Sequence, residues 1–340
     1  MRSDQTNRRF LLRRRPGGDF DPAVLELVRE PLPVPGPDQA LVRVKYLSLD
    51  PSNRIWMGEG ESYIPPVPLN AVMRGAGIGE VIASNNRRYP VGSKVIGLLG
   101  WQDYALVGGG EEFPSQRLPR FLPVPLPSLL GAMGFTGMTA YFGMLDIGRP
   151  RRGETVVVSA AAGAVGSVAG QIAKIRGARV VGIAGSREKC DWLVRELGFD
   201  AAVNRRDADW RAQLAAACPD GIDVDFENVG GEIMEAVFEL LNHHARVVLC
   251  GMIAGYGEDG AARGPRNFSV LLMRRIRLQS LIVLDYQRRF TRAGMHLAWW
   301  MRRGKLKDRQ TVVRGLEQAP AALAGMFRGE NTGKLLVELG

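Results

Sequence analysis

The sequence predicts an α/β protein with two domains, a mostly antiparallel β domain followed by a doubly wound domain built on a parallel sheet. Three observations lead to this fold class. The chain has 340 residues, which is about twice the usual size of a single domain. Its first part is rich in Pro and Gly and alternates short β-type runs with turns. Beyond residue 127 short apolar runs are separated by helical stretches of roughly 10–15 residues, as in a parallel sheet with helical crossovers.

The β domain is expected to occupy residues 1–127. Five prolines between positions 114 and 127 exclude a regular helix there and predict an extended connector. The predicted strands are short apolar and β-branched runs bounded by turn residues, at 41–44, 79–83, 94–97 and 104–107.

The parallel-sheet domain is expected to occupy residues 128–302. Ser186 is the predicted N-cap of the helix that follows the second strand. Residues 303–340 are too few to fold alone, and we expect them to return to the first domain through a β-like end at 335–339. Apolar runs predict the strands of the parallel sheet, at 155–158, 179–184, 201–203, 224–226, 246–249 and 278–284.

The charge balance is basic, with 45 Lys and Arg against 35 Asp and Glu and a net charge of +10. Such a balance can indicate a nucleic-acid partner. The Arg residues are spread along the whole chain, however, and no zinc-finger, RRM-type or helix-turn-helix pattern accompanies them. We therefore interpret the charge as a solvated basic surface with one anionic cofactor, and do not expect a nucleic-acid partner.

Several features bear on where the protein resides. No run of 18 apolar residues occurs, so we expect no transmembrane helix and no membrane partner. The Arg-rich N-terminus lacks the apolar segment of a signal peptide. Cys190, Cys218 and Cys250 form neither a disulfide framework nor a Cys-x-x-Cys metal spacing, which favours the reducing cytoplasm.

A glycine-containing turn carries the strongest functional signal. Residues 159–167 follow a predicted strand and open a predicted helix, which is the context of a dinucleotide-binding fingerprint. In that pattern Ala161 takes the first glycine place, Gly163 the second and Gly166 the third. Gly163 would let the backbone approach a pyrophosphate, and Gly166 would let the helix pack closely on the strand. The free N–H groups of the helix start would then face the phosphates.

The end of the second strand indicates which dinucleotide would bind. An NAD site usually carries an acidic residue there, which accepts hydrogen bonds from the ribose 2′-OH. Here the strand ends in small and polar residues, and Lys189 follows. Lys189 and Arg205, with Arg187 behind them, favour a 2′-phosphate and hence NADP(H). Glu188 would argue the other way if its side chain turned inward.

Several short runs, in order along nearly the whole chain, resemble the zinc-independent medium-chain dehydrogenases/reductases. The most similar group is that of leukotriene B4 dehydrogenase, prostaglandin reductase and curcumin reductase, the NADPH-dependent alkenal or one double-bond reductases. The runs that carry the resemblance are 47–51, 100–104, 137–143, 153–167, 226–231, 250–253 with Tyr256, and 331–334.

The resemblance implies a GroES-like catalytic domain completed by the C-terminal segment, a Rossmann domain that binds NADP(H), and a homodimer. It also implies a set of cofactor contacts. These are Thr139, Gly163, Ala164, Val165, Gly166, Lys189, Asn228, Cys250, Gly251, Met252, Ile253, Tyr256, Leu281, Ile282, Val283 and Asn331. Arg205 joins them on its position after the third predicted strand.

Two departures from the family pattern concern the site. Ser52 and Arg205 stand where members often have Tyr. The first lies near the expected substrate pocket and weakens inference about the substrate, whereas the second leaves phosphate binding intact.

A zinc ion is not expected. A catalytic zinc needs three protein ligands, but none of the three histidines lies in the β domain and the expected zinc-ligand stretch reads Arg-Gly-Ala-Gly at 74–77. We interpret Cys250 as a small wall residue, and the pair His243 and His244 as a cap at a helix end.

These residues predict an enzyme that reduces the C=C bond of an α,β-unsaturated ketone or aldehyde. Hydride would reach the β-carbon, and Tyr256 would donate a hydrogen bond to the developing enolate oxygen or order the ribose. Each of these assignments has an alternative. Tyr256 could be a loop residue that packs on the cofactor, and Asn228 could simply form a turn. Asn331 could be a helix C-cap, and residues 281–283 could belong to the core of the sheet. A quinone reductase, or an RNA-binding protein on the same scaffold, remains an alternative function.

Overall fold

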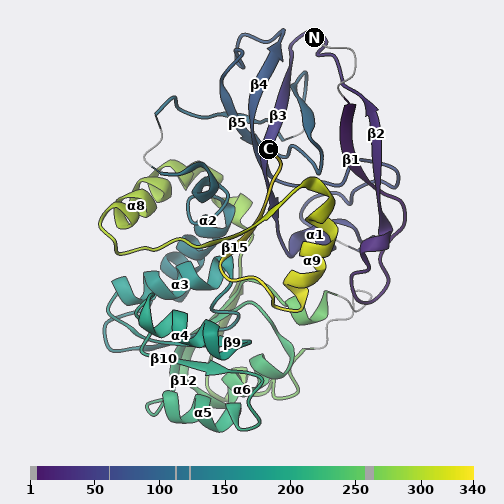
Figure 1. The fold of residues 1–340 in the computed structure, drawn as a ribbon. Coiled ribbons are helices and arrows are strands. Elements are labelled where there is room, and N and C mark those ends of the chain that lie inside the picture. Colours follow the sequence, from purple (N-terminus) through teal and green to yellow (C-terminus); the bar gives the residue numbers. More distant parts are fainter. Residues whose placement is uncertain (1–5, 61, 112, 122–123, 257–263) are drawn as a thin grey trace. The chain divides into compact units, whose positions relative to one another are not determined.

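The computed structural model describes residues 6–60, 62–111, 113–121, 124–256 and 264–340. Contacts divide the chain into a first unit, Met1–Leu130 with Gln310–Asn331 and Leu335–Gly340, and a second unit, Gly131–Arg309 with Thr332–Lys334 (Figure 1). The divisions near 130 and 309 lie a few residues beyond those expected at 127 and 302. The predicted fold class, a mostly antiparallel β domain with a Rossmann parallel-sheet domain, is confirmed.

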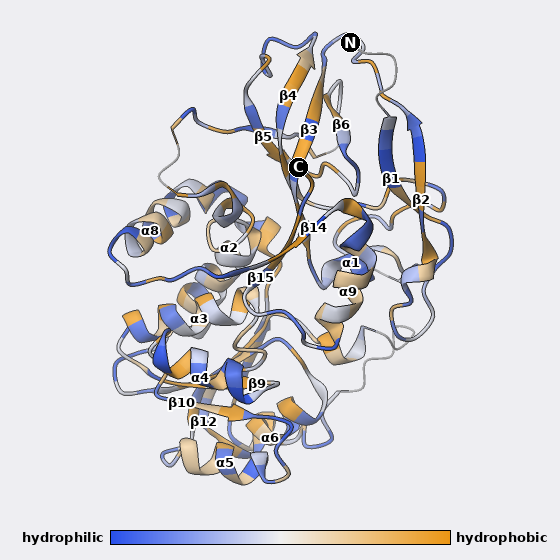
Figure 2. Cartoon of the chain, in the orientation of Figure 1, coloured by the Kyte–Doolittle hydropathy of each residue, from blue (hydrophilic) through white to orange (hydrophobic). Residues whose placement is uncertain are grey.

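The first unit is built on a mixed sheet with the order β14-β15-β3-β4-β5-β7, and β6 also pairs with β3. Its core lies beside β3, where Ala40, Val42 and Val44 are buried together with Val81 of β4. Figure 2 shows the long hydrophobic stretches of β3 and β4. The strands are β3 (Gln39–Leu49), β4 (Gly77–Ser84), β5 (Lys94–Gly97), β6 (Tyr104–Gly108), β7 (Gln116–Arg117), β14 (Gln310–Arg314) and β15 (Lys334–Glu338).

Other elements of the first unit are short. The Pro-rich connector contains the two-residue strand β7, as an extended segment can, and leads into a 3-10 turn. A separate antiparallel pair is formed by β1 (Thr6–Leu12) and β2 (Leu25–Pro31). The helices and turns are η1 (Pro22–Val24), α1 (Ser52–Trp56), η2 (Leu126–Leu129), η6 (Leu316–Gln318) and α9 (Ala319–Phe327).

The second unit is built on a parallel sheet with the order β10-β9-β8-β11-β12-β13. This order reverses direction between β8 and β11, and crevices at such a point bind ligands in open α/β sheets. The strands are β8 (Thr155–Val158), β9 (Arg179–Ala184), β10 (Ala201–Asn204), β11 (Ile222–Glu227), β12 (Leu241–Leu249) and β13 (Arg277–Ser280).

Helices cover both faces of this sheet because its strands are apolar on both sides. Val156 and Val158 of β8 belong to the core under α2, α3, α4 and α8, whereas Val157 belongs to the core under α5 and α6 (Figure 1). The helices and turns are α2 (Phe135–Phe142), η3 (Gly143–Gly148), α3 (Ala164–Ile175), α4 (Arg187–Arg195), α5 (Trp210–Ala217), α6 (Gly231–Leu240), η4 (Ile253–Gly255), α7 (Val270–Met273), η5 (Val283–Arg289) and α8 (Phe290–Arg302).

Two local predictions were wrong. The last strand ends at Ser280 instead of continuing to 284, because its partner β12 ends at Leu249, opposite Ser280, and leaves no further ladder. The pair His243 and His244 lies inside β12 and does not cap a helix. The preceding helix has already ended at an extended Leu241, and the His244 N–H donates to the carbonyl oxygen of Arg274.

Candidate functional site

The site residues of the second unit gather where its parallel strands end. Carboxyl ends of parallel strands share one edge of a sheet, so the segments after β8 to β13 lie along that edge. All predicted cofactor contacts except Thr139 and Asn331 belong to these segments or to the helix starts that follow them. The topology alone therefore brings together residues that are more than 100 positions apart in sequence.

The turn after β8 has the geometry of a phosphate-binding loop. Gly163 is the N-cap of α3, its N–H donates to the Ala160 carbonyl oxygen (2.9 Å), and no side chain caps the helix start. Gly163, Ala164 and Val165 are half-buried, whereas Gly166 is buried. A Cβ on Gly166 would lie 2.5 Å from the Ala160 oxygen, so only glycine allows this close packing. The first N–H groups of α3 therefore remain available to an anion.

A second glycine holds this turn from another segment. The Gly333 N–H donates to the carbonyl oxygen of Ala162 (2.8 Å), and Gly333 forms a parallel bridge with Gly163. Gly333 has φ +68°, and a Cβ there would lie 2.1 Å from the Arg309 oxygen. Asn331 belongs to the first unit, and its cofactor contact stays a prediction.

Three cations lie near one another at the ends of β9 and β10. The predicted cap is present, since Ser186 Oγ accepts a hydrogen bond from the Lys189 N–H (3.3 Å). Burial lowers the pKa of the Lys189 ammonium, and the positive charges of Arg206 and Arg205 lower it further. Sequence reasoning named Lys189 and Arg205 but missed Arg206, although its place directly after Arg205 was a signal. Mutual repulsion of this kind favours binding of an anion among the three groups.

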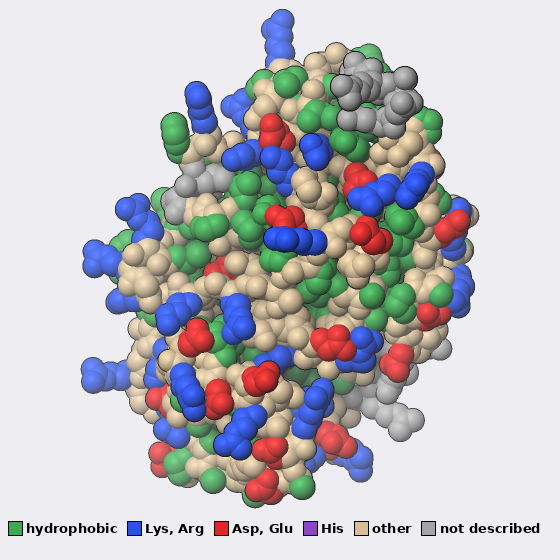
Figure 3. All heavy atoms as spheres, in the orientation of Figure 1, with side chains coloured by type: hydrophobic (Ala, Val, Ile, Leu, Met, Phe, Trp, Pro, Cys, Tyr) green, Lys and Arg blue, Asp and Glu red, His purple; other side chains and the backbone are tan. Residues whose placement is uncertain are grey.

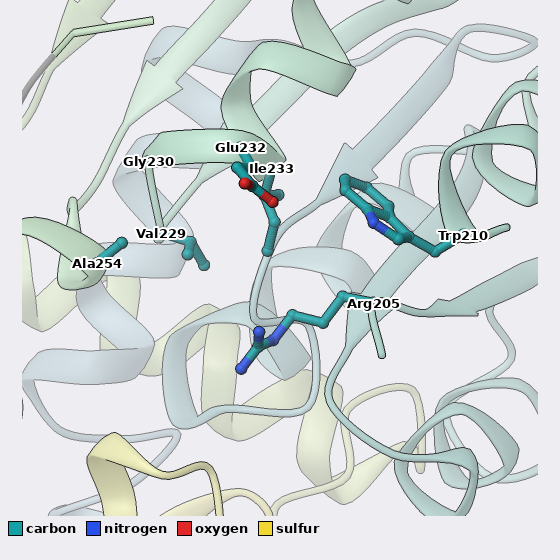
Figure 4. A pocket seen from close by; sticks show the side chains of 7 residues that line it. All are labelled: Arg205, Trp210, Val229, Gly230, Glu232, Ile233 and Ala254. Carbon is teal, nitrogen blue, oxygen red and sulfur yellow. The ribbon is translucent and has the colours of Figure 1, made fainter. Parts of the chain in front are cut away.

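Arg205 also faces a hollow of about 210 Å³ (Figure 4). Its guanidinium passes over Gly185, where a Cβ would lie 3.8 Å from Arg205 Nε. Arg187 and Glu188, at the start of α4, are both exposed. The hollow is lined by Arg205, Trp210, Val229, Gly230, Glu232, Ile233 and Ala254. Its walls thus combine one cation, Arg205, and one carboxylate, Glu232, with aromatic, aliphatic and backbone surface.

The segment after β12 runs beside the segment after β11. The N–H groups of Cys250 and Gly251 both donate to the Glu227 carbonyl oxygen, at 2.9 and 3.1 Å. Tyr256 is half-buried, and a Cβ on Gly251 would lie 3.1 Å from its hydroxyl oxygen. The absence of a side chain on Gly251 therefore makes room for the Tyr256 hydroxyl. Met252 and Ile253 continue the same segment into η4.

Cys250 is poorly suited to nucleophilic chemistry. Burial, followed by the charge of Glu227, raises the pKa of its thiol to about 12. A thiol with such a pKa stays protonated near neutral pH, and only the thiolate is a strong nucleophile.

The remaining predicted contacts are more scattered. Leu281, Ile282 and Val283 follow β13, and the Leu281 N–H donates to the Leu249 oxygen (3.3 Å). Leu281 is buried and Ile282 is exposed. Thr139 lies within α2, where its hydroxyl donates to the Phe135 carbonyl oxygen (2.8 Å).

Two buried carboxyl groups on β11 escaped sequence reasoning. Asp225 and Glu227 are fully buried, and neither oxygen of Asp225 has a hydrogen-bond partner among the described residues. Burial, and then the neighbouring Glu227, raises the pKa of Asp225 well above its ordinary value. Acidic residues two apart on a central strand were the available signal, because both then point to the same face of the sheet.

Glu227 is better supplied with partners. Its Oε1 atom accepts hydrogen bonds from Ser159 Oγ (2.6 Å) and from the N–H groups of Val229 (2.5 Å) and Gly230 (2.9 Å). The Asn228 side-chain nitrogen donates to the Ser159 carbonyl oxygen (2.7 Å). This network joins the ends of β8 and β11, where the strand order reverses.

In the described part of the chain, no group of three or more His, Cys, Asp or Glu side chains could hold a metal ion. None of the helices in that part is long and apolar enough to span a membrane.

Comparisons with known proteins agree with this architecture. The family described as the N-terminal domain of oxidoreductase matches residues 8–114, and the family described as zinc-binding dehydrogenase matches residues 164–299. The NADPH-dependent curcumin reductase of Escherichia coli (strain K12) is 41% identical over 341 residues, which cover 98% of this chain and 97% of that protein.

Two other proteins are similarly close. The NADP(+)-dependent 2-alkenal reductase of Nicotiana tabacum is 38% identical over 306 residues, covering 89% of this chain and 88% of its own. The crystal structure of CurA in complex with NADPH from Vibrio vulnificus matches with a TM-score of 0.92 and 41% identity, over 98% of this chain and 99% of that one.

Proposed function

Because the chain belongs to the zinc-independent medium-chain dehydrogenases/reductases of the curcumin, alkenal and prostaglandin reductase type, we propose that it reduces the C=C bond of α,β-unsaturated ketones or aldehydes. It is an NADP-dependent oxidoreductase. The observation that carries the proposal is the uncapped start of α3 at the point of strand reversal, together with three cations near the ends of β9 and β10.

The residues present fit NADP(H). The N–H groups at the start of α3 would hold the pyrophosphate. Lys189, Arg205 and Arg206 would surround the 2′-phosphate, whose charge of nearly −2 offsets their repulsion. The hollow beside Arg205 and Trp210 would take the adenine ring, since its walls offer flat, partly apolar surface (Figure 4).

The bound nicotinamide supplies the hydride that is added to the β-carbon of the substrate. Negative charge then collects on the substrate's carbonyl oxygen, and a hydrogen-bond donor aimed at that oxygen lowers the barrier. We assign this donor role to the Tyr256 hydroxyl, for which Gly251 leaves room. The proton for the α-carbon would come from water.

The test is an NADPH-oxidation screen across enals, enones and quinones, repeated with NADH. We expect turnover with enals or enones and NADPH. Turnover with quinones alone would favour the quinone-reductase alternative. No oxidation with any acceptor, combined with RNA binding that weakens steeply with salt, would favour the RNA-binding alternative. Figure 3 shows Lys and Arg side chains interspersed with Asp and Glu on the visible face, which does not favour it.

Replacing Tyr256 with Phe is expected to lower kcat by about 100-fold, because one donor to the enolate oxygen is lost. The NADPH dissociation constant should change little. Steady-state kinetics and a fluorescence titration with NADPH would measure both quantities. If turnover and cofactor affinity both equal those of the unmodified protein, Tyr256 has no role beyond packing.

We also propose that the chain forms a homodimer through the edge of the second unit's sheet. Strand β13 is at that edge, and Leu272 and Met273 of the neighbouring α7 are 74% and 64% exposed. Unpaired strand edges and exposed apolar side chains favour association. Analytical ultracentrifugation should find a dimer, and the double substitution Leu272→Asp with Met273→Asp should yield monomers. A monomeric unmodified protein would contradict the proposal.

A further inference from the structure

We propose that Glu227 is a positioning residue which, through Ser159, fixes the spacing between the phosphate-binding turn after β8 and the turn after β11. Neither residue is assigned a contact with cofactor or substrate. The inference rests on the proposed function, because it concerns the binding of the cofactor that serves the reaction.

The strand ladder between β8 and β11 ends just before the two turns. Strands β8 and β11 pair as far as Val158 and Phe226, and after these residues each segment turns toward its own helix, α3 or α6. A cofactor bound at this point needs both turns at a fixed separation, yet there are few ladder bonds left to hold them. The buried side chain of Glu227 occupies this position.

The contacts of Glu227 tie the two turns together. Its Oε1 atom accepts from Ser159 Oγ (2.6 Å) and from the backbone of Val229 and Gly230. The Ser159 hydroxyl accepts in turn from the Asn228 N–H (2.7 Å). Ser159 is the first residue of the turn at 159–162, and Gly230 adopts φ +77° within its own turn. The Glu227 carboxylate thus links the two turns beyond the last paired residues of the strands, although Ser159 and Glu227 are 68 residues apart in sequence.

The same residue reaches a third segment through its backbone. The Glu227 carbonyl oxygen accepts from the N–H groups of Cys250 and Gly251, the segment that leads to Tyr256. Three segments predicted to contact the cofactor therefore converge on Glu227. Loss of its carboxylate would leave the Ser159 hydroxyl and two N–H groups without their acceptor in a buried place, and the turns would relax to satisfy them.

The test compares Glu227→Ala with Glu227→Gln and Ser159→Ala. We expect Glu227→Ala to raise the dissociation constant and the KM for NADPH by about 10- to 100-fold, with a smaller change in kcat at saturating NADPH. Glu227→Gln keeps an acceptor oxygen at the same place and should restore the dissociation constant to within a few-fold. Ser159→Ala, which removes only the bridging hydroxyl, should raise it by about 3- to 10-fold.

Glu154 provides a matched control at the opposite end of β8. Its carboxylate also accepts three hydrogen bonds, two from the Arg246 guanidinium (3.0 and 2.5 Å) and one from the Arg151 N–H (2.8 Å). Glu154→Ala should lower the melting temperature but leave the NADPH dissociation constant unchanged. Glu227→Ala and Glu154→Ala each lose three hydrogen bonds to a carboxylate. A difference between them in NADPH affinity therefore reflects the position of Glu227 and not a general loss of stability.

Two results would overturn the inference. One is an unchanged NADPH dissociation constant in Glu227→Ala or, if that variant does not fold, in Ser159→Ala. The other is an equal rise in Glu154→Ala. Failure of the proposed function looks different. An unmodified protein that binds NADPH but reduces no enal or enone rejects the substrate class, while the affinity measurements still decide the role of Glu227.

Discussion

Replacing Lys189 and Arg205 together by Ala is expected to raise the KM for NADPH by about 100-fold while the KM for NADH changes only a few-fold. Each cation should contribute roughly tenfold through a charge-assisted hydrogen bond to the 2′-phosphate. NADH lacks that phosphate and therefore gains nothing from the two side chains. Steady-state kinetics with both coenzymes and one fixed enal would measure the change in preference.

The repulsion among the three cations is the structural reason for this expectation. Burial and the charges of Arg206 and Arg205 lower the pKa of Lys189, so bringing these cations together is electrostatically unfavourable, and a bound phosphate would offset their repulsion. Arg206→Ala alone should have an intermediate effect of about tenfold on NADPH.

A control variant that also loses two positive charges tests whether the change in coenzyme preference depends on Lys189 and Arg205 in particular. Arg176 and Arg195 are exposed at the C-terminal ends of α3 and α4, away from the helix starts that face the site. The double substitution Arg176→Ala with Arg195→Ala should leave the coenzyme preference unchanged. If the KM values for NADPH and NADH rise in parallel in the Lys189 and Arg205 variant, the assignment of these residues to the 2′-phosphate is wrong.

Replacing Asp225 by Val is expected to stabilise the protein by about 1–3 kcal/mol near pH 7, the usual cost of a buried polar group without partners. Asp225 is fully buried on β11, and neither of its oxygens has a hydrogen-bond partner in the described part of the chain. Urea unfolding of the two proteins would measure the difference in the free energy of unfolding.

The pH dependence of this effect has a definite sign. The pKa of Asp225 is raised in the folded protein, first by burial and then by Glu227, above its ordinary value of 3.8. Between the two values the folded chain keeps a proton that the unfolded chain has lost, so the free energy of unfolding falls as pH rises. The loss is at most about 1.4 kcal/mol per pH unit. The advantage of Asp225→Asn over the unmodified protein should therefore grow from pH 5 to pH 8.

Asp223 offers a matched comparison on the same strand. Its oxygens accept hydrogen bonds from the Thr155 N–H (2.8 Å) and from Asn242 Nδ2 (2.9 Å). Asp223→Val should therefore destabilise the protein, by about 1–3 kcal/mol. If Asp225→Val and Asp223→Val change the free energy of unfolding by the same amount, the hydrogen-bond partners of Asp223 do not account for a difference between the two carboxyl groups.

Local sequence patterns predicted much of the second unit. The strand at 179–184, the cap at Ser186 and the helix that opens after Gly163 all lie where periodicity and capping chemistry indicated. These features depend on residues a few positions apart, and the physical rules that govern them are local. The order of such elements also determined the parallel sheet, because strands joined by helices leave few other topologies.

Other features depended on which distant segments meet. Ser280 ends its strand because β12 stops at Leu249, and Arg206 belongs with Lys189 because β9 and β10 end side by side. Burial of Asp225 and the bond between Ser159 and Glu227 arise only when β11 inserts next to β8. The sequence alone thus determined most of the elements, their order and the glycine-containing turn that opens α3. The tertiary structure decided the electrostatics and the side-chain network of the site, since both depend on distances that sequence separation does not specify.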